Sequence, residues 1–131
     1  MRSHHVSRVI AATQEAVYEF ASEVENLPRW AAGLAQADVV RVDDTLIVES
    51  PMGRVKVRFV ERNAFGVLDH DVTLPSGTVV TNPVRVLAHP NGAEVVFTVR
   101  QIDLDDAEFD RDIETVAADL DRLAGLLSSP A

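Results

Sequence analysis

The last segment of the chain, residues 105–128, places the strongest limit on how it can fold. Its apolar residues recur every three or four positions, at Phe109, Ile113, Val116, Ala117, Leu120, Leu123, Ala124 and Leu127. This spacing predicts one long helix with a single apolar face, and Asp105 and Glu108 form the capping-box pattern that starts such a helix. Residues 39–101 are instead typical of strands joined by tight turns. A curved antiparallel sheet with the helix on its concave side would bury both apolar faces.

The remaining elements complete an α+β order. Residues 4–11 predict a first strand, and Thr13 predicts the N-cap of a helix with Val17, Phe20 and Ala21 on its apolar face. A second short helix follows Asn26, with Pro28 in its first turn and with Trp30 and Leu34 on its buried side. Six further strands are expected at residues 37–42, 45–50, 54–62, 66–74, 78–88 and 94–102. The 131 residues therefore predict one domain, 1–131, with about seven strands and two short helices between the first two strands.

Composition excludes several classes of function. The chain has no cysteine, and it has neither the ligand spacing of a metal site nor the glycine loops of nucleotide-binding proteins. We therefore expect no metal and no cofactor. The formal charge is −9, with nine acidic residues against two arginines between positions 103 and 122. This face would repel phosphate backbones and anionic lipid, so we expect no nucleic-acid partner, no membrane insertion and a cytoplasmic location.

Alternation along the strands assigns side chains to the two faces of the sheet. The expected inward sets are Val55, Val57 and Phe59; Leu68, His70, Val72 and Leu74; Val80, Asn82, Val84 and Val86; and Val95, Phe97 and Val99. Pro83 predicts a bulge or an edge beside Asn82. Thr98 points outward, and Arg58, Asp69, Asp71 and Arg85 are expected to form cross-strand ion pairs on the convex face.

Four short segments of the sequence resemble those of a known superfamily. Residues 12–20 (ATQEAVYEF) and 26–30 (NLPRW) resemble the first two helical junctions of the START-like or birch-pollen-allergen-like helix-grip superfamily. The stretches 68–71 (LDHD) and 82–86 (NPVRV) are similar to bacterial polyketide cyclase/dehydrase-like members. The resemblance implies a cavity under the long helix that accepts a lipid, polyketide, quinone or similar hydrophobic molecule. It also implies that some relatives catalyse cyclisation or dehydration, while others only carry ligands or bind chaperones.

The candidate site follows from these faces. The residues expected to contact a ligand are Tyr18, Trp30, Val57, Phe59, Leu68, His70, Val72, Asn82, Val84, Phe97, Ile113, Val116 and Leu120. His70 is the candidate catalytic acid or base, because with Asn82 it could polarise and protonate a ketone or enol. In the alternative interpretation, the two side chains form hydrogen bonds with each other, with a backbone group or with water, and at most orient a ligand.

Three functions remain open from the sequence. The first is binding of a small hydrophobic ligand between the sheet and the last helix. The second is a polyketide cyclase, aromatase or dehydratase that uses His70. The third is a chaperone-type or other protein-interaction module that docks a basic partner on the acidic helix. The sequence leaves open whether the protein is a monomer or a homodimer.

Overall fold

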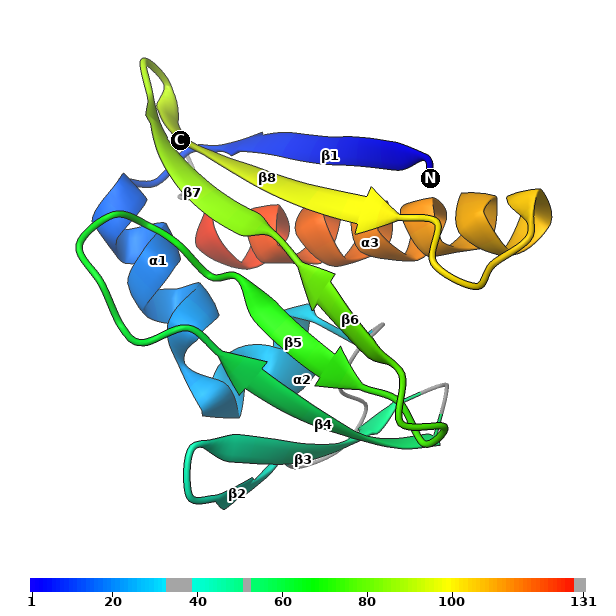
Figure 1. Ribbon diagram of the computed structural model, residues 1–131. Coiled ribbons are helices and arrows are strands. Elements are labelled where there is room, and N and C mark those ends of the chain that lie inside the picture. Colours follow the sequence, from blue (N-terminus) through cyan, green and yellow to red (C-terminus); the bar gives the residue numbers. More distant parts are fainter. Residues whose placement is uncertain (33–38, 51–52, 129–131) are drawn as a thin grey trace.

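A computed structural model describes residues 1–32, 39–50 and 53–128 (Figure 1). Eight strands and three α-helices make up these residues. In chain order the elements are β1 (Ser3–Ile10), α1 (Gln14–Ser22), a 3-10 turn (Val24–Asn26), α2 (Leu27–Trp30), β2 (Val40–Val42), β3 (Thr45–Ser50), β4 (Gly53–Phe59), β5 (His70–Thr73), β6 (Val79–Asn82), β7 (Val84–His89), β8 (Gly92–Arg100) and α3 (Asp106–Leu127).

The strands form two antiparallel sheets, with the orders β1–β8–β7 and β2–β3–β4–β5–β6. The long helix α3 runs along the three-stranded sheet and also packs against α2 (Figure 1). This arrangement confirms the expected α+β fold with a long C-terminal helix and two short helices after the first strand. The strand count differs, because one expected strand is divided in two.

That division falls at Pro83. The strand expected over residues 78–88 is β6, which pairs with β5, followed by β7, which pairs with β8. Pro83 has no N–H to give to a ladder, and its carbonyl instead accepts a hydrogen bond from the Thr98 N–H at 2.9 Å. The chain thus passes from one sheet to the other within a single residue, which is a larger break than the predicted bulge.

A second link joins the sheets just before β5. Residues 66–69 were expected to belong to the same strand as β5, but the backbone of residues 66–68 pairs with β7 instead, while the Asp69 carbonyl accepts the Val60 N–H at 3.0 Å. The Leu68 N–H donates to the Val84 carbonyl, and the Val86 N–H donates to the Gly66 carbonyl, each at 2.8 Å. We call residues 66–69 and 83–86 the junction between the sheets. It holds the start of β5 in place.

The helix ends show which capping signals were correct. The Thr13 hydroxyl accepts the Ala16 N–H at 3.1 Å, and Asp105 and Glu108 form the predicted reciprocal capping box. Asn26 differs from expectation: its side chain makes no N-cap bond to α2 and donates to the Phe20 carbonyl at 3.1 Å. Gly33, Leu34 and the first two residues of the strand expected at 37–42 lie outside the described residues.

The core lies between α3 and the inward faces of the strands. The largest fully buried side chains include Ile10 of β1, Val57 of β4, Val95 of β8 and Phe109 and Leu120 of α3. The alternation read from the sequence is confirmed for most inward positions. None of the helices in the described part of the chain is long and apolar enough to cross a membrane.

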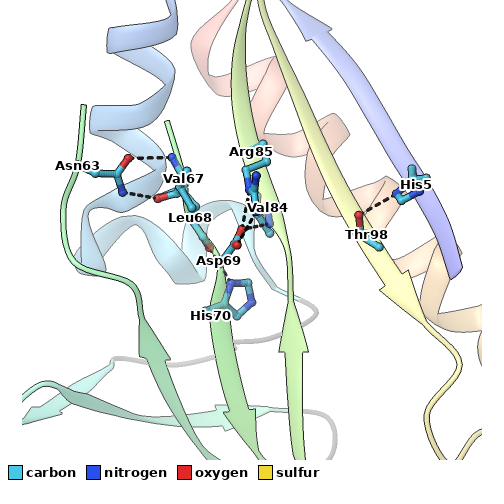
Figure 2. Close-up of polar contacts among 9 residues, drawn as sticks. All are labelled: His5, Asn63, Val67, Leu68, Asp69, His70, Val84, Arg85 and Thr98. Atoms are coloured by element: carbon cyan, nitrogen blue, oxygen red, sulfur yellow. Dashed lines mark hydrogen bonds and ion pairs between the residues drawn. The ribbon is translucent and has the colours of Figure 1, made fainter. Parts of the chain in front are cut away.

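The outward faces depart from expectation in two places. Thr98 is buried although it points away from the core, and its hydroxyl lies 2.8 Å from His5 Nδ1 on the neighbouring strand (Figure 2). Asp69 and Arg85 form the expected cross-strand ion pair. Arg58, however, pairs with Asp44 at 3.0 Å rather than with the carboxylate opposite it, Asp71, which accepts a hydrogen bond from the Thr81 hydroxyl.

Candidate functional site

A cavity of about 160 Å³ lies where α2 and α3 face strands β4, β5, β6 and β8. It sits beside the division between the sheets. The pairing of β7 with β8 ends at Val84 and Phe97, while β6 continues in the other sheet beside β5. The end of β8, which is still paired with β1 but no longer with β7, forms one wall together with the residues after it, and β5 and β6 form another.

Seven of the predicted ligand contacts meet in this cavity. They are Trp30, Phe59, His70, Val72, Asn82, Phe97 and Val116. The other six lie elsewhere. Val57, Val84 and Leu120 are packed inside the core with at most 1% of their surface exposed, and Ile113 packs against that core. Tyr18 and Leu68 line a second hollow of about 470 Å³ at the end of β4, which shares Phe59 with the cavity.

His70 occupies the aromatic part of the cavity. The strand register places Phe59 and Asn82 directly opposite it on the two neighbouring strands. The Phe59 ring is tilted against the imidazole with centroids 4.7 Å apart, and the Phe97 ring meets it edge-on at 5.9 Å. Asn82 Nδ2 lies 3.4 Å from His70 Nε2. The predicted pair is thus assembled within an apolar frame.

The hydrogen bonds of His70 define its tautomer. Nδ1 lies 3.0 Å from the Leu68 carbonyl (Figure 2), and a carbonyl oxygen can only accept, so Nδ1 carries the proton. Burial lowers the pKa of the imidazole, and this outweighs the Leu68 carbonyl and the Asp69 and Asp71 carboxylates, which raise it. The ring is therefore neutral at pH 7, with the lone pair on Nε2. The sequence suggested that His70 protonates a ketone, which would require a protonated, positively charged imidazole. The neutral imidazole instead offers Nε2 as a hydrogen-bond acceptor.

The residue before His70 is fixed to the other sheet. The Asp69 carboxylate accepts the Val84 N–H at 2.9 Å and two N–H groups of Arg85 at 3.0 and 2.8 Å (Figure 2). The Arg85 guanidinium, together with the Val84 N–H, lowers the pKa of Asp69 despite some desolvation. These bonds hold β5 against β7 and so set the position of the imidazole.

Tyr18 and Asn63 hold residues 66–69, the segment that leads into β5, through a chain of hydrogen bonds. The Asn63 side chain accepts the Val67 N–H at 3.1 Å and donates to the Val67 carbonyl at 3.0 Å (Figure 2). The Tyr18 hydroxyl accepts the Asn63 N–H at 2.9 Å. Tyr18 therefore contributes to the approach to β5, at a distance from the cavity that the sequence expected it to contact.

The α3 wall contains two carboxylates that were not among the predicted ligand contacts. Asp112, Thr115, Val116 and Asp119 all line the cavity. Desolvation raises the pKa of Asp112 even though its residue retains exposed surface. Helical spacing could have predicted this position. Asp112 lies four residues before the inward Val116 and Asp119 lies three residues after it, so both share its side of the helix.

Asp119 also connects α3 to α2. Its carboxylate pairs with Arg122, and the Arg122 Nε donates to the Trp30 carbonyl at 3.4 Å. The Trp30 indole Nε1 is buried and has no hydrogen-bond partner among the described residues. Trp30 thus packs at the cavity, as predicted, with α2 secured to α3 through its backbone.

Sequence reasoning missed the remaining wall residues. Leu74, Val80 and Val99 belong to the expected inward faces but were not singled out as ligand contacts, and Leu27, Ala31, Arg100, Ile102 and Leu104 lie at element ends, where alternation gives no signal. Among the described residues, no group of three or more His, Asp or Glu side chains could hold a metal ion.

Comparison with known proteins shows which family the chain belongs to. Residues 1–127 match the model of the family described as "Polyketide cyclase / dehydrase and lipid transport". A search of curated proteins finds no match. XoxI from Bacillus cereus has a similar structure, with a TM-score of 0.76 and 13% identity over 97% of this chain and 96% of XoxI.

Two further solved structures share the fold. The Aha1 dimer from Colwellia psychrerythraea has a TM-score of 0.76 and 17% identity over 98% of this chain and 97% of its own. DynU16, a protein in the dynemicin biosynthetic locus, has a TM-score of 0.74 and 12% identity over 95% of this chain and 46% of DynU16. At these identities the likeness shows the fold alone.

Proposed function

The chain belongs to the polyketide cyclase/dehydrase and lipid transport family, and on that premise we propose that it binds a small, mainly apolar molecule in the cavity between α3 and the two sheets. The observation that supports this proposal most directly is the cavity itself. Its walls include Phe59, Val72 and Phe97, whose side chains would gain contacts from a guest. A guest would remove the apolar area of these walls from water, which contributes roughly 25 cal/mol per Å² before the costs of ordering the guest.

The volume limits the size of the guest. A buried apolar cavity of about 150 Å³ can hold benzene, whereas pockets for drug-sized ligands occupy about 300–1,000 Å³. The space beside His70 therefore suits one ring or a short chain. A larger lipid, polyketide or quinone would leave part of itself outside this space.

A pair of neighbouring substitutions on β6 tests this proposal. Val80 lines the cavity, while Val79 is 53% exposed on the opposite face. Val80→Phe fills the cavity and should abolish binding, and Val79→Phe should leave binding unchanged. Native mass spectrometry and thermal shift with single-ring aromatics, short alcohols, fatty acids and quinones would measure this. No bound species across the panel, or equal binding by both variants, would contradict the proposal.

The unprotonated Nε2 of His70 favours a second candidate function at the same site, which is catalysis. A cyclase, aromatase or dehydratase could use His70 as a general base, because a neutral imidazole at the cavity wall can remove a proton from a bound enol or alcohol. This candidate predicts turnover that collapses in His70→Ala while affinity for the guest falls little. A parallel loss of both would instead support simple binding.

The proposal also includes the extent and setting of the protein expected from the sequence: one ligand-binding domain over residues 1–131, cytoplasmic, bacterial, and either a monomer or a homodimer. The family match over residues 1–127 supports the single domain. The dimer described for the Colwellia psychrerythraea structure is a property of that protein.

A further inference from the structure

His70 Nε2 is a buried hydrogen-bond acceptor without a strong donor. Its only contact given by the described residues is Asn82 Nδ2 at 3.4 Å, beyond the 2.7–3.2 Å range of ordinary hydrogen bonds from N–H groups. The imidazole cannot turn to satisfy this nitrogen elsewhere, because Nδ1 is held by the Leu68 carbonyl and the ring is packed between Phe59 and Phe97. Nε2 is therefore a fixed acceptor beside the aromatic rings of the cavity wall.

Nε2 and the Asn82 amide together match one functional group. A hydroxyl oxygen placed about 2.8 Å from each could donate its hydrogen to Nε2 and accept one from Nδ2, since the two nitrogens are only 3.4 Å apart. A carbonyl oxygen would place its lone pairs against that of Nε2. A methyl group would leave both polar atoms unsatisfied.

The surroundings further restrict the molecule that carries the hydroxyl. The rings of Phe59, His70 and Phe97 provide flat, apolar contacts, which favour a planar guest. The cavity has room for about one ring. Two carboxyls, Asp112 and Asp119, line the cavity against one guanidinium, Arg100, which donates to the Ser3 hydroxyl at 2.9 Å, and this balance of charge disfavours an anionic guest.

Resting on the proposed function, we propose that the guest is a neutral, planar molecule of about one ring within the cavity, and that its phenolic or enolic hydroxyl donates a hydrogen bond to His70 Nε2. Phenols and enols combine a planar body with a hydroxyl that is a stronger donor than that of an aliphatic alcohol. The Asn82 amide then donates to the same oxygen, and its contact with Nε2 becomes a shared contact with the guest.

Phenol and toluene form the matched probe pair, because a hydroxyl in one replaces a methyl group of similar size in the other. Calorimetric titration at pH 7.5 should show phenol binding about tenfold tighter than toluene, the equivalent of one well-made hydrogen bond beyond its desolvation. In His70→Phe the order should reverse, because the phenol hydroxyl would be buried without its acceptor. His4→Phe, the same change at an exposed histidine of β1, should keep the wild-type ratio.

Nitrogen NMR of the wild-type histidine tests the same inference without relying on a variant that folds. The free protein should show a protonated Nδ1 and a bare Nε2, and phenol but not toluene should shift the Nε2 resonance in the direction of hydrogen bonding. A proton on Nε2 in the free protein, or toluene binding as tightly as phenol, would overturn the inference and leave the proposed function standing. Failure of both probes, together with the wider ligand panel, would overturn the proposed function as well.

Discussion

At position 70 the strand register determines what a histidine can do. The residues opposite the imidazole are Phe59 and Asn82, and the carbonyl that fixes its tautomer belongs to Leu68, two residues earlier. None of these neighbours stabilises a positive charge strongly enough to offset burial, so the pKa of His70 is lowered.

This burial gives stability a defined pH dependence. The unfolded chain takes up a proton at this histidine near pH 6.5, and the folded chain does so only at lower pH. Below about pH 6.5 the unfolded state therefore binds more protons, and stability falls as pH falls, by at most about 1.4 kcal/mol per pH unit from this group. Above pH 6.5 the contribution of His70 should be constant.

Urea unfolding at pH 7.5 and pH 5.5 would measure the effect. His70→Phe should lose less stability than the wild type between these pH values, because it cannot take up the proton. The control His4→Asn changes an exposed residue of β1 and should follow the wild type. Equal acid sensitivity of the wild type and His70→Phe would contradict the neutral buried imidazole.

At the scale of elements, the junction between the sheets depends on a glycine. Gly66 has φ +73°, and a Cβ built on it would lie 2.2 Å from the Val86 carbonyl oxygen, a backbone atom of β7. A side chain here would push apart the backbone pairing that links residues 66–68 to β7. The position thus requires both a left-handed conformation and a close approach of two backbones.

Gly77 is the matched control for this effect. It also has positive φ, at +91°, but nothing lies within 4 Å of an added Cβ. Gly77→Ala should cost about 1–2 kcal/mol from conformation alone, while Gly66→Ala should cost about 3–4 kcal/mol because overpacking adds to the strain. Denaturant unfolding of the two variants would measure the difference. Similar costs would show that β7 moves away without penalty.

The elements also show what sequence patterns can and cannot specify. Helical spacing and the capping box define α3 because both depend on residues close in sequence, and period-two alternation places His70 and Asn82 on the inner face for the same reason. Pro83 signalled an irregularity, but its size depends on which partners β6 and β7 find in space. Whether an inward residue borders the cavity or packs in the core, as Val57 and Val84 do, depends on the separation of two sheets.

At the scale of the whole molecule, the cavity couples elements that are distant in the chain. Its walls come from α2, both sheets and α3. A guest that binds only the folded state should stabilise it by about 2.7 kcal/mol at a free concentration one hundred times its Kd. Hydrogen exchange with and without guest should show increased protection in β5, β6, β8 and α3 together. Protection confined to one sheet would contradict a site shared between them.

The division of the strand at Pro83 affects how such proteins can diversify. The cavity lies beyond Val84 and Phe97, where the β7–β8 ladder has ended, so its width is set by side chains rather than by backbone pairing. Substitutions there can enlarge or reshape the chamber while every ladder stays intact. One scaffold can in this way acquire new guests during evolution without first having to acquire a new fold.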